Sequence, residues 1–373
     1  MEVETTIIGA GVIGLAIAAA LSKQDQNIYV IESNATFGNE TSRRNNEVIH
    51  AGIYYPKDSL KTRLCVEGNR LLRRLCESNQ IPFRMCGKLI VATSEEDVIQ
   101  LEALAARAKD NGVKDLDLLS GAECRKMEPR LRAVAALYSP SSGIIDSQCL
   151  IRHFVAQAGM NGVTFVYQTR IEKVVKIIPG QYAIYVVYPD GEKERFTTRR
   201  LINAAGLDAD RIAASMGLDI DQQGYRQYFW KGEYFSVQWP LSTIRQLIYP
   251  VPEPQMTGLG VGVITDLSGR LRLGPNAIFM PNRAMDHTVD PGRLEDSFNA
   301  ARRYLPSLRR EDISPDMAGI RPKLQGPGDP LRDFIIQEES ANGLPGVVNL
   351  AGIESPGLTA CIAIANHVKG LIA

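Results

Sequence analysis

The sequence predicts an α/β protein, with α+β character, whose nucleotide-binding domain is discontinuous. Three observations predict this fold. Residues 6–32 have the pattern of a strand, a glycine turn, a helix and a second strand, residues 196–206 form a strand that ends in small residues, and residues 347–372 form a strand that enters a helix. Because these units lie far apart along the chain, we expect them to share one sheet, with a mostly antiparallel β-sheet domain inserted between them.

The N-terminal unit carries the most specific pattern in the chain. One apolar run ends at Gly9, an alanine-rich apolar stretch follows Gly14, and a second apolar run ends at the acid Glu32. This is the order of a Rossmann-like βαβ unit that binds a dinucleotide. Gly9 allows the tight turn, Gly11 lets the backbone approach a pyrophosphate, and Gly14 lets the helix pack on the strand. We expect Glu32 to accept hydrogen bonds from the adenosine ribose.

Two other interpretations of this segment are weaker. Residues 5–22 contain no charge, and a stretch of that length is close to a short transmembrane helix. The glycines at Rossmann spacing and the strand that follows argue against a membrane span. Acidic residues within positions 1–4 argue against a signal peptide, which begins with a basic region. We therefore expect no transmembrane segment and a cytoplasmic protein, with a peripheral membrane contact as an open alternative.

The composition limits the class of protein. The chain has 373 residues, enough for two domains, and is 45% hydrophobic and 23% charged, as in globular enzymes. Basic and acidic residues both number 42, so no overall charge favours a nucleic acid as partner. The six cysteines form no CxxC pair and no cluster with histidines. We expect free thiols, with neither a disulfide framework nor a bound metal.

Between the two ends of the chain, hydrophobic periodicity predicts alternating helices and strands. Helices are expected over residues 60–77, 94–112, 148–159, 296–305 and 358–372, and strands over 87–93, 164–168, 183–188, 196–203, 335–337 and 347–350. Residues 226–274 are rich in aromatic residues and in β-strand formers. We therefore assign residues 1–84, 143–222 and 315–373 to the nucleotide-binding domain, and residues 85–142 and 223–314 to the inserted substrate-binding domain.

The C-terminal segment 349–360 has a pattern of its own. Ser355 suits the N-cap of a helix, Pro356 suits the first helical position, and Gly357 permits close approach of another group. A strand would then enter a helix whose bare N-terminus points at a ligand with negative charge, such as the N1–C2=O edge of a reduced flavin. An ordinary connection between a strand and a helix is the alternative.

At this point the sequence resembles a known family. The N-terminal βαβ unit, Asn203–Gly206 and Gly352–Thr359 resemble FAD-dependent oxidoreductases of the D-amino-acid-oxidase type. Within that group, further stretches are similar to L-2-hydroxyglutarate dehydrogenases or oxidases: Arg44–Tyr55, Tyr249–Pro252 and Ala318–Leu324. The resemblance extends over nearly the whole chain. It implies that the cofactor is FAD and that the partner is a small 2-hydroxy (di)carboxylate substrate.

The resemblance also implies which residues hold FAD. The ADP half would lie against Gly9, Gly11, Val12, Ile13, Gly14, Glu32 and Ser33, with Ile171 at the adenine and Ala205 and Gly206 beside the pyrophosphate. The path from the pyrophosphate to the flavin would be lined by Thr41, Ser42, Arg43 and Asn45. The isoalloxazine ring and the ribityl chain would contact Gly352, Ile353, Gly357, Leu358 and Thr359.

Oxidation of a 2-hydroxy acid requires loss of a hydride from C2 to flavin N5 and of a proton from the hydroxyl group. A histidine suits the proton because its pKa is near neutrality, and His50, one of four histidines, lies in the loop expected beside the flavin. The alternatives to a role of His50 as the base are a packing role and covalent attachment of the flavin. Arg321, with Lys323 beside it, is the candidate for carboxylate recognition. Tyr234 and Tyr249 are weaker candidates, since aromatic strand residues are usually core.

Three functions remain open on the sequence alone. The first is oxidation of a 2-hydroxy acid, with L-2-hydroxyglutarate converted to 2-oxoglutarate. The second is an amine or amino-acid oxidase of the same fold, and the third is a flavin-binding subunit without turnover of its own. The electron acceptor is also open: a quinone, an electron-transfer protein and oxygen all remain.

Overall fold

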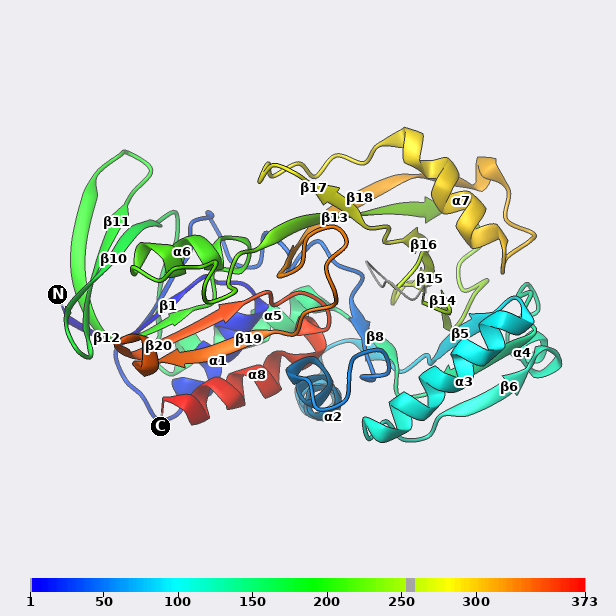
Figure 1. Cartoon of the computed structure of the whole chain (residues 1–373), viewed down its shortest axis with the longest axis horizontal. Coiled ribbons are helices and arrows are strands. Elements are labelled where there is room, and N and C mark those ends of the chain that lie inside the picture. The colour runs from blue at the N-terminus through cyan, green and yellow to red at the C-terminus, as the bar shows by residue number, and fades with distance from the viewer. Residues whose placement is uncertain (1, 253–258, 373) are drawn as a thin grey trace.

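The computed structural model describes residues 2–252 and 259–372. The remaining internal positions, 253–258, fall within the segment 223–314 assigned to the substrate-binding domain and lie outside the described residues. The molecule is elongated, with one sheet and the helices α1, α5 and α8 at one end, and a second sheet with α3, α4 and α7 at the other (Figure 1). Both chain termini lie at the end of the first sheet (Figure 1). The sequence-based prediction of a mixed α/β fold is therefore confirmed.

The first sheet joins segments that are far apart in the sequence. Its strand order is β10-β11-β12-β1-β2-β9, and β20 adds to β12 and carries β19. The pairs of β1 with β2 and β12, of β2 with β9, and of β12 with β20 are parallel, whereas β10, β11 and β19 pair in an antiparallel manner. The bounds are β1 Glu2–Ile8, β2 Ile28–Ile31, β9 Thr164–Val166, β10 Arg170–Ile178, β11 Gln181–Val187, β12 Lys193–Asn203, β19 Ile335–Glu339 and β20 Leu344–Ala351.

Helices cover this sheet because their apolar faces need a partner. α1 (Val12–Leu21) has almost every side chain buried, since it contacts both α5 (Ser147–Met160) and α8 (Gly357–Leu371). This burial explains why residues 5–22 carry no charge without crossing a membrane. No helix in the described residues is long and apolar enough to span a bilayer. The cytoplasmic location stays a prediction. The other helices here are α2 (Leu60–Asn79) and α6 (Ala209–Ser215).

The second sheet is mostly antiparallel, with the parallel pair β5–β14 as an exception. Its order is β17-β13-β16-β15-β14-β5-β7-β6, and β18 pairs along β13. Its strands are β5 Lys88–Ala92, β6 Asp117–Ser120, β7 Ala135–Ser139, β13 Tyr228–Val237, β14 Leu247–Pro250, β15 Gly262–Thr265, β16 Leu271–Gly274, β17 Ile278–Met280 and β18 Ile313–Lys323, and its helices are α3 Glu95–Asp110, α4 Gly121–Met127 and α7 Leu294–Arg302. The predicted domain boundary at 315 falls inside β18.

Several short elements complete the fold. A small antiparallel sheet joins β3 (Val48–Ile49), β8 (Gly143–Ile145) and β4 (Phe83–Arg84). Short 3₁₀ helices lie at η1 Gly206–Asp208, η2 Pro291–Arg293, η3 Arg310–Asp312 and η4 Ser340–Asn342. All six cysteines lie within the described residues and are free thiols.

The register of the parallel strands brings three turns to one edge of the first sheet. Ile8 pairs with Asn203, and Asn203 pairs with Asn349. The turns that follow β1, β12 and β20 therefore begin at nearly the same level, at the carboxyl edge where such sheets bind ligands. Asn203 fixes this arrangement, because its side-chain amide donates to Asn349 Oδ1 at 2.8 Å while both residues are buried.

Candidate functional site

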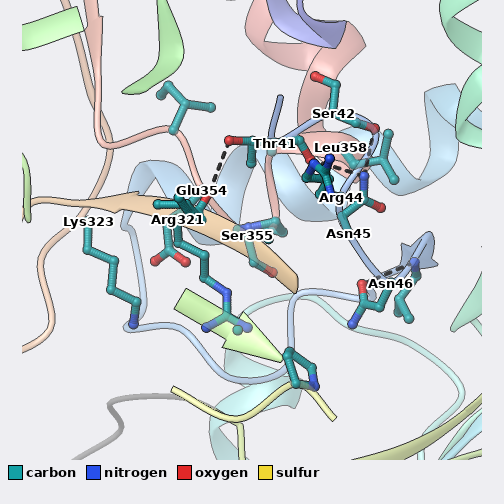
Figure 2. Close-up of a pocket in the computed structure, with 18 of the residues that line it drawn as sticks. Thr41, Ser42, Arg44, Asn45, Asn46, Arg321, Lys323, Glu354, Ser355 and Leu358 are labelled. Carbon is teal, nitrogen blue, oxygen red and sulfur yellow. Dashed lines mark hydrogen bonds between the residues drawn. The ribbon is translucent and has the colours of Figure 1, made fainter. Parts of the chain in front are cut away.

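A cavity of about 200 Å³ opens at this edge of the sheet and extends toward the second sheet. Many residues proposed from the sequence line it: Gly11, Val12, Ile13, Thr41, Ser42, Asn45, His50, Gly206, Tyr234, Tyr249, Arg321, Lys323, Ile353, Gly357 and Leu358. Ser42, Asn45 and Leu358 lie on one side of the close-up, and Arg321, Lys323 and Glu354 gather on the other (Figure 2). One cavity therefore joins the proposed nucleotide and substrate residues.

The first wall is built around the N-terminus of α1. Val12 N–H donates to Ser42 Oγ at 2.9 Å, so the 41–46 loop lies directly over the glycine turn. A Cβ added to Gly11 would approach Ser42 Oγ to 3.2 Å. Gly206 has a positive φ of 56°, and a Cβ there would meet no atom within 4 Å, which leaves bare backbone facing open space. Two helix N-termini, those of α1 and α8, border the cavity and favour negative charge.

Gly9 and Gly14 serve packing instead of lining the cavity. Gly9 has a φ of +100°, and a Cβ there would meet Ala204 O at 2.5 Å. A Cβ at Gly14 would come within 2.0 Å of Gly9 O. These two glycines therefore let β1, α1 and the end of β12 approach closely, and only Gly11 of the three borders the space for a ligand.

Other residues proposed for the cofactor also lie outside the cavity lining: Glu32, Ser33, Arg43, Ile171, Ala205, Gly352 and Thr359. Glu32 directly follows β2, and its carboxylate accepts from Ala10 N–H and Asn34 N–H at 2.8 Å each. Its carbonyl accepts from Thr169 N–H at 2.9 Å, which brings Ile171, in β10, close to the end of β2. Glu32 and Ile171 stay proposed contacts for the adenosine end, and the other residues outside the lining keep the roles proposed for them from the sequence.

Arg43 was the arginine proposed from the sequence, whereas its neighbour Arg44 is the one that lines the cavity. Both backbone N–H groups donate to Glu40 O in a turn that sends the two side chains in different directions. Arg43 is exposed, whereas Arg44 lines the cavity. Sequence reasoning missed Arg44 because the orientation of consecutive side chains in an irregular loop follows no periodic rule.

Two further positions near the C-terminus differ from the sequence-based expectation. α8 begins at Gly357, with Pro356 at the N-cap position, so Ser355 does not cap the helix. The Ser355 hydroxyl instead lies 3.4 Å from His50 Nε2 and 3.4 Å from Tyr55 OH. Thr359 lies one turn deeper, where its hydroxyl accepts from His50 N–H at 2.9 Å and donates to Val48 O at 3.2 Å. Thr359 thus holds the loop that carries His50.

His50 lies at the end of β3 and is buried, with 5% of its surface exposed. Its Nδ1 lies 3.5 Å from Lys88 Nζ in β5, and its Nε2 faces Ser355. Burial, and then the charge of Lys88, keep the pKa of His50 well below 6.5. The imidazole is therefore neutral at neutral pH, as a proton acceptor must be.

A cationic cluster lies on the opposite wall. Arg321 and Lys323 both come from β18, two positions apart, so they project from the same face of the strand. Lys323 is buried, and burial lowers its pKa. Glu354 lies between these two residues in Figure 2 and forms a buried ion pair with Lys61 of α2, with Lys61 Nζ 2.8 Å from Glu354 Oε1. Burial raises the pKa of Glu354, but Lys61 and Lys323 outweigh burial and lower it to about 2.

The tyrosines connect the two walls. Tyr249 accepts from Asn46 Nδ2 at 3.1 Å through its hydroxyl, and burial raises its pKa. Tyr234 is buried and hydrogen-bonded by Arg321, although burial still raises its pKa. Both side chains are thus neutral hydroxyl groups that also belong to the core. Gly232 lies beside them, and a Cβ there would meet Arg321 Nη2 at 2.8 Å, so a larger residue would displace this guanidinium.

Sequence reasoning proposed no individual binding or catalytic role for part of the lining: Arg44, Asn46, Val48, Tyr55, Ala204, Gly232, Leu259, Gly260, Pro275, Gly319, Ile320, Leu331, Leu350, Glu354, Ser355 and Pro356. It also missed Lys88 and Gln227. Gln227 Oε1 accepts from Gly352 N–H at 2.8 Å, and its Nε2 donates to Gly206 O at 3.0 Å. Gln227 therefore joins two turns that the sequence linked to FAD. The one available signal for Lys88 was that this charged residue begins the otherwise apolar run 88–92.

Comparison with known proteins identifies the family. The sequence family described as FAD dependent oxidoreductase (DAO) matches residues 4–371. The chain belongs to this FAD-dependent oxidoreductase family. It is an FAD enzyme, and the cavity fits that cofactor, because the bare backbone at Gly206 and the α1 N-terminus suit a pyrophosphate while the α8 N-terminus suits a flavin.

Relatives within the family cover nearly the whole chain. The mitochondrial L-2-hydroxyglutarate dehydrogenase of Arabidopsis thaliana is 37% identical over 98% of this chain and 83% of the relative. The mitochondrial L-2-hydroxyglutarate dehydrogenase of Caenorhabditis elegans is 29% identical over 98% of this chain and 92% of the relative.

Solved structures agree with this fold. L-α-glycerophosphate oxidase from Mycoplasma pneumoniae, dithionite-reduced with FAD bound, superposes with a TM-score of 0.86 at 28% identity, covering 100% of this chain and 95% of that one. Glycine oxidase from Geobacillus kaustophilus superposes with a TM-score of 0.81 at 22% identity, covering 100% and 94%. The second likeness concerns the fold alone.

Proposed function

We propose that this protein oxidises L-2-hydroxyglutarate to 2-oxoglutarate. The observation that carries the proposal is one cavity in which a neutral histidine, His50, and two cations, Arg321 and Lys323, all line the wall. The names of the relatives at 37% and 29% identity support the same substrate.

His50 accepts the proton in the proposed reaction. When bound, FAD supplies the two-electron acceptor for the hydride that leaves C2 of the substrate. His50 Nε2, on the cavity side next to Ser355, takes the proton from the substrate hydroxyl. General-base assistance of this kind contributes roughly 10²–10⁴-fold to a rate. Thr359 keeps the imidazole in position through its bond to the His50 backbone.

The charge balance of the cavity favours a dianion. Arg44, Arg321 and Lys323 line the cavity, and the carboxylate of Glu354 is already paired with Lys61. Among the described residues of the wall, positive charge therefore exceeds negative charge. A planar guanidinium can bind a carboxylate through two parallel bonds. A substrate with two carboxylates matches this excess better than a monocarboxylate does.

The test is anaerobic reduction of the purified holoenzyme, followed by the flavin absorbance. L-2-Hydroxyglutarate is expected to bleach the flavin, whereas the D-enantiomer leaves it oxidised. L-Glutamate, which replaces the hydroxyl by an amine, tests an amino-acid oxidase, and L-α-glycerophosphate tests the activity named for the structural relative. Faster bleaching by either of these compounds than by L-2-hydroxyglutarate contradicts the proposal.

A steady-state assay with an artificial electron acceptor tests the third interpretation, a flavin-binding subunit without turnover. Sustained production of 2-oxoglutarate is expected. A single bleaching event without turnover would instead identify such a subunit. Replacing the dye by a quinone, an electron-transfer protein or oxygen then compares the candidate acceptors.

A further inference from the structure

Lys88 is a buried lysine with no acidic partner among the described residues. It begins β5 and has 0% of its surface exposed. Within residues 2–252 and 259–372, its ammonium makes no salt bridge, and its one polar side-chain contact is His50 Nδ1 at 3.5 Å. The rings of Tyr249 and Tyr54 lie 4.6 Å and 5.3 Å from Nζ. Burial of an unpaired charge is costly, so such lysines occur where a neutral amine is useful.

The protonation of Lys88 decides what His50 can do. A charged Lys88 donates to Nδ1, so the proton of the neutral imidazole must then sit on Nε2, and Nε2 cannot accept another. An uncharged Lys88 accepts from Nδ1–H, which leaves the Nε2 lone pair free toward the cavity. The ring nitrogens are thus coupled through the imidazole, as in other sites where a second residue fixes the histidine tautomer.

The two residues cannot both be charged at low cost. Their nitrogens are 3.5 Å apart, and like charges that are buried at such a distance repel strongly. A proton that arrives on Nε2 is therefore stable only if another leaves Nδ1. Lys88 Nζ is the group positioned to receive it.

We propose that Lys88 is the terminal acceptor of a two-step proton relay that begins at the substrate hydroxyl and passes through His50. This inference rests on the proposed function. The hydroxyl proton moves to Nε2, the Nδ1 proton moves to the Lys88 amine, and the hydride leaves C2 for the cofactor. The substrate becomes a 2-oxo acid, His50 returns to a neutral state with the opposite tautomer, and Lys88 becomes an ammonium. Lys88 acts through His50 and is thus a positioning residue.

The surroundings of Lys88 agree with this role. Within the part of the chain that the structure describes, the titratable groups that face it are His50, Cys65 of α2, Cys86 just before β5, and Tyr54 and Tyr249. Burial lowers the pKa of Lys88 to about 8, against the opposing effect of the two cysteines. Burial raises the pKa of each cysteine and tyrosine, so these four groups are neutral near pH 8.

The relay predicts a pH profile that a lone histidine base does not. The rate of flavin reduction should rise about tenfold per pH unit below pH 8 and level off above it, because only the amine form of Lys88 is competent. A lone His50 with a lowered pKa would give a flat profile from pH 6.5 upward.

The variants are Lys88→Met and Lys88→Arg, measured by anaerobic stopped-flow reduction of the holoenzyme between pH 6.5 and 9.5. Lys88→Met should lose the rise with pH, because the titrating group is gone. In Lys88→Arg the rate of flavin reduction should be lower than in the wild type at every pH, by roughly 100-fold or more. The reason is that a permanent charge keeps the imidazole proton on Nε2 of His50. Lys231→Met is the matched control, because Lys231 is a buried lysine that pairs with Asp286. In this variant the rate of flavin reduction should still rise with pH. A rise that persists in Lys88→Met overturns the relay.

A second measurement needs neither turnover nor a variant. Nitrogen-15 NMR of histidine-labelled holoenzyme reports the tautomer of His50, one of four histidines in the chain. The expected result is Nδ1–H at pH 9.5 and Nε2–H near pH 7, and Nε2–H throughout overturns the relay. If no 2-hydroxy acid reduces the wild-type flavin, the proposed function fails, whereas reduction with an unchanged profile in Lys88→Met refutes the relay alone.

Discussion

The buried ion pair between Lys61 and Glu354 offers the sharpest stability prediction. It joins the first turn of α2 to the turn before α8, with 3% and 7% of the two side chains exposed. In Lys61→Met the alkyl chain remains while the charge disappears, so Glu354 stays buried without its main partner. Removing one partner of a buried pair costs roughly 3–5 kcal/mol.

The pKa of Glu354 shows how strongly all its surroundings, with Lys61 first among the charges, stabilise the carboxylate against burial. It falls from an ordinary 4.5 to about 2, which corresponds to about 3 kcal/mol in favour of the folded state. Because the folded pKa is depressed, this stability is complete above pH 4.5 and is lost as the pH falls through about 2. The loss in free energy of unfolding caused by Lys61→Met should therefore be largest at pH 7 and should become smaller below pH 4.5.

The assay is urea unfolding with the same excess of FAD for every variant, so that cofactor binding shifts all curves alike. Lys61→Met/Glu354→Gln should recover part of the loss, because the buried carboxylate that lost its ion pair is then absent as well. Lys193→Met removes the exposed pair with Glu172 and should shift the unfolding midpoint far less, because solvent screens exposed charges. A deficit that is independent of pH, and equal in the single and double variants, would refute the electrostatic reasoning.

Three further predictions concern the cavity. His50→Ala should slow flavin reduction by L-2-hydroxyglutarate roughly 10²–10⁴-fold with FAD still bound; an unchanged stopped-flow rate contradicts its role as base. Arg321→Ala should weaken substrate binding about 10–150-fold, the loss of a charged hydrogen bond, and a normal substrate titration argues against it. Gln227→Leu leaves Gly352 N–H and Gly206 O without their partner, so FAD affinity should fall roughly tenfold in a fluorescence titration; wild-type affinity excludes that link.

Local patterns were sufficient for much of the fold. The glycine turn, the apolar periodicity of α2 and the capping box at Ser94 with Asp97 are set by neighbours in the sequence, so the predicted helices and strands agree with the observed elements to within a few residues. β10 was missed because its side chains are mostly exposed and give no strong alternation. Its residue Ile171 had been expected only as a contact of adenine.

Side-chain direction in loops required the tertiary structure. The sequence pointed to Arg43, yet Arg44 borders the cavity, and Ser355 faces His50 where a helix cap was expected. Both differences arise in turns, where the path of the backbone depends on contacts with distant segments such as Val12 and Tyr55.

The sequence by itself determined the class of the protein: a nucleotide-binding sheet, a split domain and a resemblance to FAD enzymes, because these follow from short patterns and their order. Only the tertiary structure placed Lys88 against His50. Only the tertiary structure also placed Glu354 against Lys61 of α2. These partners are 38 and 293 residues apart, and no local periodicity links them. The protonation of the site depends on such contacts, since burial and neighbouring charge set each pKa.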